Sequence, residues 1–421
     1  MKNVINTIEH DATEVKTFTF VFIKWIAISA LIGIIGGAVG TLFYKSVLYA
    51  NAIRAARPWL IYFLPFAGLA IVALYKITKT EGENTNDIID SILQGNNVPI
   101  VLMPVIFIAT TFTHLFGGSA GREGAALQIG GSIGCNVGKL LKLDEKEERI
   151  AILSGMSALF SALFGAPITA TVFALEVCSV GIIHYSGLVP CGVSALVAYG
   201  ITGLFGIGKT SFAVQTVTET APMFLKIAVL AVLCAILSVI FCRSMHISNK
   251  LASKIIPNPY IKVIAGGVII IGLTMLVGNQ NYNGGGVEVI KNAIEGGQAE
   301  IPAFAWKILF TAITLSCGYK GGEIVPTFFI GSTFGCVIGP LLGIPSGFAA
   351  AIGLAATFCG AVNCPLASVI LSVELFGGGN TVYFAEACFI SYMLSGYTSL
   401  YEEQKIVYSK LKAEFINIKA E

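Results

Sequence analysis

Long apolar runs are the feature that most limits what this chain can fold into. They lie near residues 18–43, 59–75, 100–116, 223–242, 261–277 and 347–373. Apolar runs of roughly 17–25 residues cross a bilayer as helices, whereas barrel strands would alternate over about ten. Only 12% of the 421 residues are charged, too few to cover a water-soluble protein of this length. We therefore predict an all-α, multi-pass protein of the cell membrane, in contact with lipid and not with nucleic acid.

The N-terminus and the cysteines add little to this prediction. The first apolar run is too long for a secretory signal, and it follows the acidic residues Glu9, Asp11 and Glu14, so we expect no cleaved leader. The ten cysteines form no CxxC pair and lie mostly inside apolar runs. We expect them to be small apolar fillers, and we expect neither a metal nor a cofactor.

The sequence repeats itself at an offset of about 200 residues. Residues 129–138 and 330–339 share three glycines and a cysteine at matching positions, an offset of 201. Residues 166–176 match residues 364–374 at an offset of 198. Because the matches follow the same order, they indicate two homologous halves.

We place these halves at residues 17–205 and 223–405. Residues 206–222 would link them, and residues 406–421 would form a C-terminal tail. Two such repeats are common in transporters and channels, where the site lies near the membrane midplane and broken helices point their ends at the substrate. The residues alone leave open whether the repeats are parallel or inverted.

Two glycine-rich stretches at equivalent positions are the predicted helix breaks. They span residues 117–125 and 318–326, and the repeat register sets Gly121 on Gly322. Glycines allow the backbone to approach an ion closely. A helix that begins just after such a stretch leaves its first N–H groups unpaired at the positive end of its dipole, which favours an anion. Two such ends could together hold a small dehydrated anion.

Each stretch also carries an acid, Glu123 in the first half and Glu323 in the second. Ionised, Glu123 would itself occupy an anion site, and protonation would release it, so anion and proton movement would be coupled. An ionisable side chain inside a membrane costs free energy, so its presence there indicates a functional role. The alternative is a structural ion pair, of Glu123 with Arg122 and of Glu323 with Lys320.

Other polar residues have more ordinary interpretations. Glu176 and Glu374 end apolar runs at matching repeat positions, and we expect them to cap helices or bind the other half. His114 is expected to be a hydrogen-bonded interior histidine. Ser119 and Ser132 lie in GxSxG patterns, which raises an intramembrane serine protease as a remote alternative. That motif requires a strand-to-helix elbow, which a helical chain does not offer.

These motifs resemble the CLC family of chloride channels and chloride/proton exchangers over nearly the whole chain. The matching segments are Gly121-Arg122-Glu123-Gly124 (GREGP loop), Gly165-Ala166-Pro167 (NAP segment), Glu374-Leu375-Phe376-Gly377 (EL-G segment) and Leu400-Tyr401 (the PLY segment with the inner anion-site tyrosine). The resemblance implies a CLC-type fold of two inverted repeats with broken helices. It also implies a homodimer with one pore per subunit and cytoplasmic termini, and no CBS domains are expected.

Three departures from the chloride-type pattern resemble the fluoride/proton antiporter branch of that family. An asparagine-rich stretch at residues 81–88 replaces the serine loop GSGIP. The second-half loop carries Glu323 where chloride-type members have GxFxP, and Val177 stands where the usual inner proton glutamate would be. Val325 occupies a position that is polar in some members of the branch.

The resemblance implies a secondary active antiporter, not an enzyme, that exports fluoride in exchange for protons. Glu123 would be the gate and Glu323 the inner proton relay. The expected anion-binding residues are Asn84, Thr85, Asn86, Gly121, Arg122, Gly124, Ile324, Val325 and Tyr401. Chloride/proton exchange and a voltage-gated chloride channel of the same fold are the alternatives. A passive channel usually lacks an acid on the proton path, whereas both acids are present here.

Overall fold

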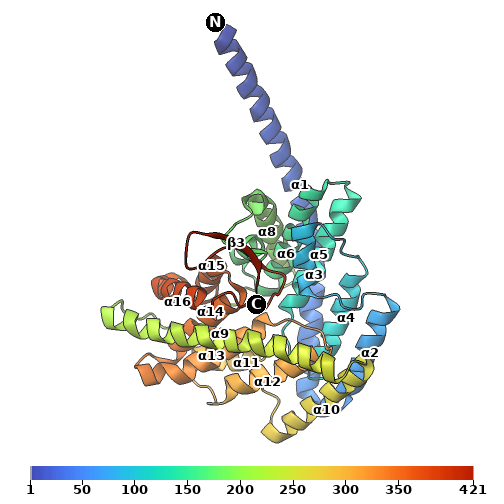
Figure 1. Cartoon of the computed structure of the whole chain (residues 1–421), viewed down its shortest axis with the longest axis vertical. Helices are drawn as coiled ribbons and strands as arrows, with labels where there is room; N and C mark the ends of the chain where they lie inside the picture. Colours follow the sequence, from blue (N-terminus) through green and yellow to red (C-terminus); the bar gives the residue numbers. More distant parts are fainter. Residues whose placement is uncertain (1, 421) are drawn as a thin grey trace.

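The computed structural model describes residues 2–420, with side chains for residues 14–420, and this part of the chain is a helical bundle (Figure 1). The helices of the first half are α1 (Lys2–Ala56), α2 (Leu64–Ile77), α3 (Thr85–Gln94), α4 (Leu102–Leu115), α5 (Glu123–Leu140), α6 (Glu145–Phe164), α7 (Pro167–Glu176) and α8 (Leu188–Leu204). Those of the second half are α9 (Ala221–Ile255), α10 (Pro259–Val277), α11 (Val287–Glu295), α12 (Ala303–Ser316), α13 (Ile324–Ile338), α14 (Ser346–Val362), α15 (Pro365–Phe376) and α16 (Thr381–Leu394). Short 3-10 helices are η1 (Pro58–Phe63), η2 (Tyr185–Gly187), η3 (Gly339–Leu342) and η4 (Gly378–Asn380).

The two halves repeat the same order of helices, so that α1–α8 correspond to α9–α16. At their centre Gly121 and Gly322 form an antiparallel bridge, with N–H to O distances of 2.7 and 2.8 Å in the two directions. Because the bridged residues are equivalent, an approximate two-fold axis relates the halves. The predicted fold of two inverted repeats with broken helices is confirmed. The exact domain boundaries stay a prediction.

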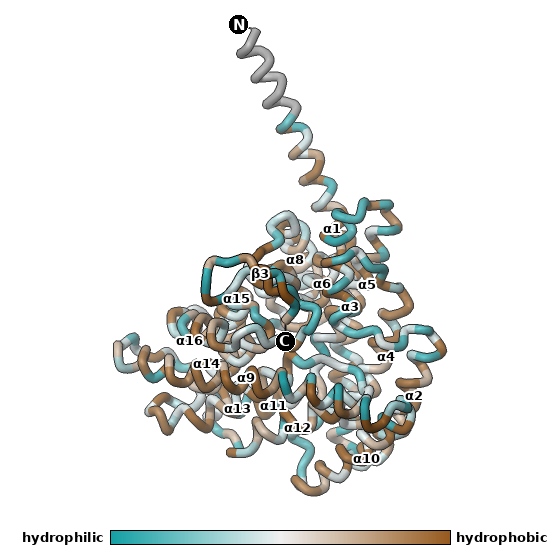
Figure 2. Tube along the Cα trace, in the orientation of Figure 1, coloured by the Kyte–Doolittle hydropathy of each residue, from teal (hydrophilic) through white to brown (hydrophobic). Residues whose placement is uncertain are grey.

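Six described helices are long and apolar enough to cross a membrane. They are Glu14–Ala56, Pro58–Thr78, Tyr185–Leu204, Ala221–Ile255, Pro259–Val277 and Ile324–Leu342. Four of them contain predicted apolar runs, and Figure 2 shows the hydrophobic stretches along α9 and α10. The run at 100–116 forms only the shorter helix α4.

The prediction of one spanning helix across residues 347–373 is wrong. The chain there forms α14 and α15, separated at Asn363, whose φ is +57°. Pro365 begins α15, and a residue before proline disfavours helical backbone, so the first helix cannot run on. The same break separates α6 from α7, where Gly165 precedes Ala166-Pro167 with a φ of +64°.

The repeated glycines allow two pairs of helices to pack with their backbones in contact. A Cβ on Gly155 in α6 would overlap the carbonyl oxygen of Gly130 in α5. Gly353 in α14 stands in the same relation to Gly331 in α13. Small residues at such crossings let membrane helices approach closely. This packing explains the glycine pattern that revealed the repeat.

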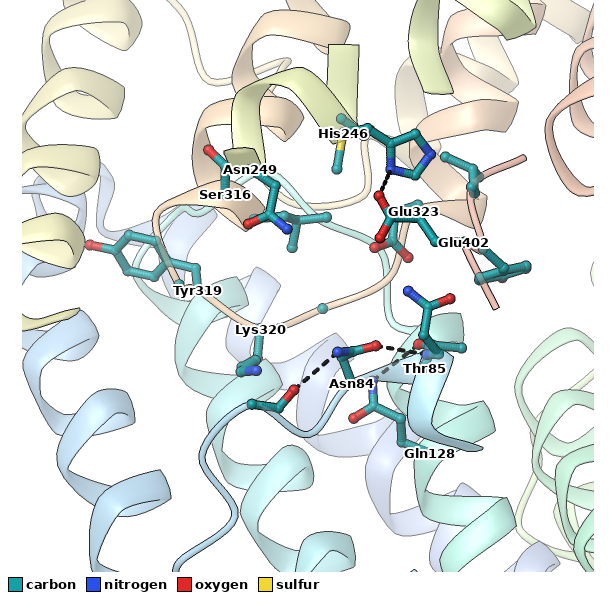
Figure 3. Close-up of a pocket in the computed structure, with 18 of the residues that line it drawn as sticks. Asn84, Thr85, Gln128, His246, Asn249, Ser316, Tyr319, Lys320, Glu323 and Glu402 are labelled. Atoms are coloured by element: carbon teal, nitrogen blue, oxygen red, sulfur yellow. Dashed lines mark hydrogen bonds and ion pairs between the residues drawn. The ribbon is translucent and has the colours of Figure 1, made fainter. Parts of the chain in front are cut away.

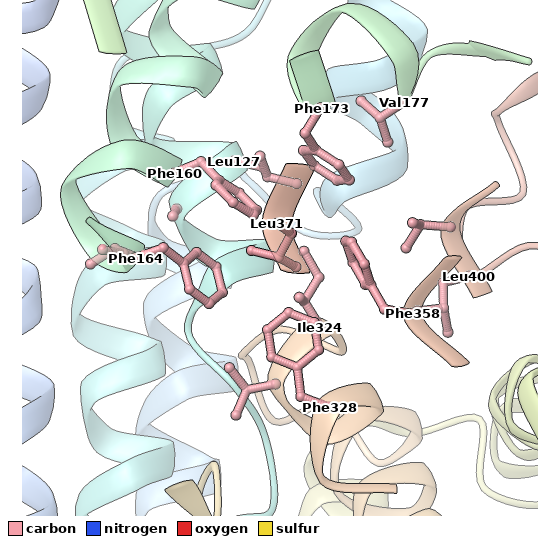
Figure 4. Close-up of a cluster of buried hydrophobic side chains, with 14 of the residues drawn as sticks. Leu127, Phe160, Phe164, Phe173, Val177, Ile324, Phe328, Phe358, Leu371 and Leu400 are labelled. Atoms are coloured by element: carbon pink, nitrogen blue, oxygen red, sulfur yellow. The ribbon is translucent and has the colours of Figure 1, made fainter. Parts of the chain in front are cut away.

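A cluster of aromatic side chains surrounds the start of α13 (Figure 4). Phe328 lies with its ring centroid 5.8 Å from that of Phe164 and 5.2 Å from that of Phe358. Ile324, the first residue of α13, is fully buried in this cluster. The N-terminus of the helix is thereby held in place between the two halves.

The tail is not a helix but part of a small sheet, which adds three strands to the predicted all-α fold. The strands are β1 (Ser179–Val180), β2 (Lys405–Tyr408) and β3 (Phe415–Lys419), with β1 parallel and β3 antiparallel to β2. Lys410, between β2 and β3, donates to the carbonyl oxygen of Tyr392 at 2.8 Å. The tail, described as far as Ala420, is therefore fixed against both halves. Glu9, Asp11 and Glu421 lie outside the described side chains.

Candidate functional site

The two predicted helix breaks meet at the centre of the molecule. The Gly121–Gly322 bridge joins them, α5 begins at Glu123 and α13 begins at Ile324. A Cβ on Gly322 would overlap the backbone nitrogen of Gly124, so only glycine allows this approach. The N-termini of α5 and α13 therefore converge from the two halves, as a site for a small anion requires.

Glu123 lies at the N-terminus of its own helix, with a side chain that is almost fully buried. Its Oε2 atom accepts a hydrogen bond from the backbone N–H of Arg122 at 2.9 Å, and its Oε1 atom lies 3.5 Å from Nε of Arg122. The guanidinium of Arg122 stacks on the ring of Tyr44 at 4.1 Å. The carboxylate thus combines the predicted ion pair with a backbone N–H that an anion could otherwise use.

Glu323 has a different environment. Its buried Oε2 atom has no hydrogen-bond partner and lies 3.3 Å from the position that a Cβ on Gly124 would occupy. Lys320, the ion-pair partner allowed by the sequence, donates instead to the carbonyl of Glu83 at 3.2 Å and lies over the ring of Tyr75. A buried carboxylate oxygen without a partner is costly and points to a ligand or a proton at this place.

A polar cavity of about 380 Å³ opens beside Glu323 (Figure 3). Asn84, Thr85 and Asn86 line it from the first half, together with Tyr401 from the end of the second. Asn84 is the N-cap of α3, because its side chain accepts from the N–H of Asn86 at 2.7 Å. The asparagine-rich stretch therefore presents a third helix N-terminus to the cavity.

Gln128 is a cavity residue that the sequence analysis missed. Its Nε2 atom donates to the hydroxyl of Thr85 at 3.2 Å, whereas its Oε1 atom is buried without a partner. The hydroxyl of Tyr401 is likewise buried and unpartnered. A polar residue one turn after Gly124 in an otherwise small and apolar helix was the available signal. Glu323, Gln128 and Tyr401 thus leave three buried polar atoms open around one cavity.

The remaining predicted anion-binding residues do not line this cavity. Gly121 donates its N–H to Gly322, and Arg122 donates its backbone N–H to Glu123. Ile324 and Val325 bury apolar side chains, so only their backbones could contact an anion. Gly124 lies between the two acids, with Glu323 Oε2 close to its Cα. The assignment of anion contacts to these five stays a prediction.

Glu176 and Glu374 are confirmed as caps for the opposite half. Oε2 of Glu176 accepts from the N–H of Ala367 at 2.9 Å, at the start of α15. Oε2 of Glu374 accepts from the N–H of Thr169 at 2.8 Å, at the start of α7. His114 is confirmed as an interior histidine, since its buried ring lies with Nε2 3.2 Å from the carbonyl of Gly121.

Among the described residues, neither GxSxG serine forms a hydrogen bond with a histidine. Ser119 Oγ lies 3.1 Å from Thr311 Oγ1 and accepts from the fully buried ammonium of Lys307 at 3.0 Å. Ser132 donates to the carbonyl of Pro99 at 2.9 Å. The protease alternative therefore finds no support. Lys307 was also missed, because its partners lie up to 188 residues away in the chain.

Comparisons with known proteins agree with this geometry. Residues 67–396 match the family model described as voltage gated chloride channel. A chloride/fluoride channel protein of Pseudomonas syringae pv. tomato is 34% identical over 403 residues, covering 92% of this chain and 87% of that protein. The H⁺/Cl⁻ exchange transporter ClcA of Vibrio cholerae is 25% identical over 392 residues, covering 83% of this chain and 81% of its own.

Solved structures show the same fold. The crystal structure of a CLC-type fluoride/proton antiporter matches with a TM-score of 0.88 and 32% identity, covering 91% of this chain and 98% of that one. A slow cyanobacterial Cl⁻/H⁺ antiporter matches with a TM-score of 0.75 and 20% identity, covering 88% and 94%. The second likeness concerns the fold alone.

Proposed function

Because this chain belongs to the CLC family of voltage-gated chloride channels and ion/proton exchangers, we propose that it exports fluoride across the cell membrane in exchange for protons. The observation that carries the proposal is Glu323, whose open carboxylate oxygen faces both the first half's helix N-terminus and a polar cavity. The similarity to a CLC-type fluoride/proton antiporter supports the same ion.

The composition of the cavity favours fluoride. Fluoride is small and strongly hydrated, so dense hydrogen-bond donors have to replace its water. The unpartnered hydroxyl of Tyr401 supplies a donor on one wall, and the N-terminus of α3 adds the positive end of its helix dipole there. Where chloride-type members carry a serine loop, this chain has the capped asparagine turn at Asn84.

The coupling follows from competition for the same donors. Ionised Glu123 accepts the N–H of Arg122, and a proton on that carboxylate removes the charge that holds it there. An anion can then take the place of the carboxylate. Glu323 passes the proton onward to the inner side, since it lies across the Gly121–Gly322 bridge from Glu123. The same site is therefore occupied in turn by the transported anion and by the carboxylate of Glu123.

The direction of transport depends on which end is cytoplasmic. Thr210 of the linker donates its N–H to the carbonyl of Phe164 just before α7, whereas Lys405, directly before the tail, donates to the carbonyl of Cys178 just after α7. The linker and the tail therefore lie at opposite ends of this helix. Lys405 and the tail's Lys410, Lys412 and Lys419 place four lysines at one end, whereas the linker carries only Lys209. Positive charge favours the cytoplasmic side, which supports a cytoplasmic tail. We also propose a homodimer with one pathway in each chain.

The test is ion efflux from vesicles that contain the purified protein. A fluoride electrode and a chloride electrode follow the release of each ion from matched preparations, with protein-free vesicles as the control. We expect fluoride to leave faster than chloride and to drive protons inward. Faster release of chloride, still with proton movement, would replace this assignment with chloride/proton exchange.

A further inference from the structure

The proton that Glu323 passes to the inner side has to cross the cavity that Glu323 faces. Its Oε2 atom has no protein partner, and position 177 offers only the buried side chain of Val177. The cavity volume of about 380 Å³ has room for on the order of ten waters. A side chain that accepts these protons should therefore line this cavity and also reach the solvent.

His246 in α9 and Glu402 form a contact pair on the cavity wall (Figure 3). Nδ1 of His246 lies 3.0 Å from Oε1 of Glu402, and its Nε2 atom lies 2.7 Å from the carbonyl oxygen of Ser399. A carbonyl oxygen only accepts, so Nε2 carries a hydrogen. The contact between Nδ1 and Oε1 then requires one further proton, on either atom. The pair holds this proton between two bases.

The pair also has access to water. The side chain of Glu402 is 47% exposed, and that of His246 is 15% exposed. Two cations line the same cavity, but Lys320 donates to the carbonyl of Glu83 and Lys262 donates to Ser253. His246 and Glu402 thus form a hydrogen-bonded acid–base pair on the described cavity wall that also reaches the solvent.

We propose that the His246–Glu402 pair takes up protons from Glu323 and does the work of the acid that position 177 lacks. The O–H bond at Oε2 of Glu323 breaks, and its proton passes through cavity water to the free oxygen of Glu402, so that the pair holds two. One proton then passes from the pair to inner water, and the pair returns to its single proton. The inference rests on the proposed proton-coupled transport.

The test compares His246→Gln and Glu402→Gln with the unchanged protein in vesicles. Glutamine keeps a hydrogen bond but cannot take up a proton. We expect proton uptake driven by an outward fluoride gradient to fall at least about tenfold at pH near 6. The deficit should shrink toward pH about 8, because Glu323 then loses its proton directly to solvent more often. Glu403→Gln is the matched control, since Glu403 pairs with Lys419 away from the cavity, and should transport normally.

A second measurement tells proton transfer by the His246–Glu402 pair apart from a purely structural role of the pair. Fluoride binding in detergent, followed by calorimetry, should change by less than about twofold in both variants. Undiminished proton uptake, or a loss that is the same at every pH and accompanied by lost binding, would overturn the proposal. If the unchanged protein moves protons only with chloride, the fluoride assignment fails and the same comparison is made with a chloride gradient. A protein that moves no protons refutes both.

Discussion

Glu123 and Glu323 show how a residue's surroundings determine which groups its carboxylate can bind. Both were predicted from glycine-rich loops in the same repeat register. Where the halves meet, the side chain of Glu123 is buried, whereas Glu323 is partly buried with a buried Oε2 atom. Glu123 already accepts a backbone N–H, whereas Glu323 leaves Oε2 open toward a cavity. Gln128, Lys307 and His246 escaped prediction because what makes each notable is a partner distant in sequence, at separations of 43 to 188 residues.

Glu323→Gln should abolish coupled proton movement. The amide cannot carry a proton onward, although its size is unchanged and neither repeat loses packing. Proton uptake into vesicles under an outward fluoride gradient, with voltage clamped by an ionophore, measures the effect. The proposed dimer, judged by gel filtration, should persist. Normal proton uptake would mean that Glu323 is structural and that another acid carries the proton.

Glu123→Gln should likewise stop proton coupling, since the side chain can no longer alternate between charged and neutral forms. The same proton-uptake assay applies, and Glu145→Gln at the exposed start of α6 serves as the control. Retained coupling in Glu123→Gln would remove the mechanism in which carboxylate and anion share one site.

At the scale of elements, the ends of helices, rather than their faces, form the candidate site and the contacts between the two halves. The sequence placed the breaks at residues 117–125 and 318–326, because glycine runs stand out from apolar surroundings. It missed the break at Asn363, since only Asn363 and Pro365 mark it within a long, mostly apolar run, and the turn depends on one left-handed residue. The capping role of Glu176 and Glu374 was predicted, but the helices that they cap were not, because their reciprocal partners lie about 200 residues away in the chain.

Glu374→Gln should destabilise the protein without touching the ion path. The carboxylate accepts from the N–H groups of Ile168 and Thr169 and from the Thr169 hydroxyl at the start of α7. An amide has one acceptor oxygen, so we expect a loss of about 1–2 kcal/mol and a lower Tm in detergent, followed by intrinsic fluorescence. Glu288→Gln, exposed at the start of α11, should leave the Tm unchanged. An equal Tm for both variants would contradict the capping role.

At the scale of the whole molecule, the tail links the two halves. Composition indicated a membrane protein and the repeats indicated its two-fold plan, but nothing in residues 406–421 pointed to a sheet. Strand β2 finds its partner at β1, more than 220 residues earlier, and so short a strand has no periodicity of its own to detect.

Lys410→Met should loosen this tie. The ammonium donates to Tyr392 and Ser395 near the end of α16 and to Asn363 at the end of α14. Without it those acceptors lose a charged donor in a partly buried place. We expect faster proteolysis after residue 404 and slower fluoride efflux, because Tyr401 lies just before the tail. The control is Lys412→Met. Because the side chain of Lys412 is exposed, this variant should behave as the unchanged protein.

The Gly121–Gly322 bridge has a consequence for how the pathway changes its access from one side to the other. A rocking motion that parted the halves at this point would break two hydrogen bonds and strand four backbone groups away from water. The centre of the molecule therefore acts as a fixed pivot. Opening and closing have to come from side chains that turn around it, so the same protein frame can face both sides without its halves separating.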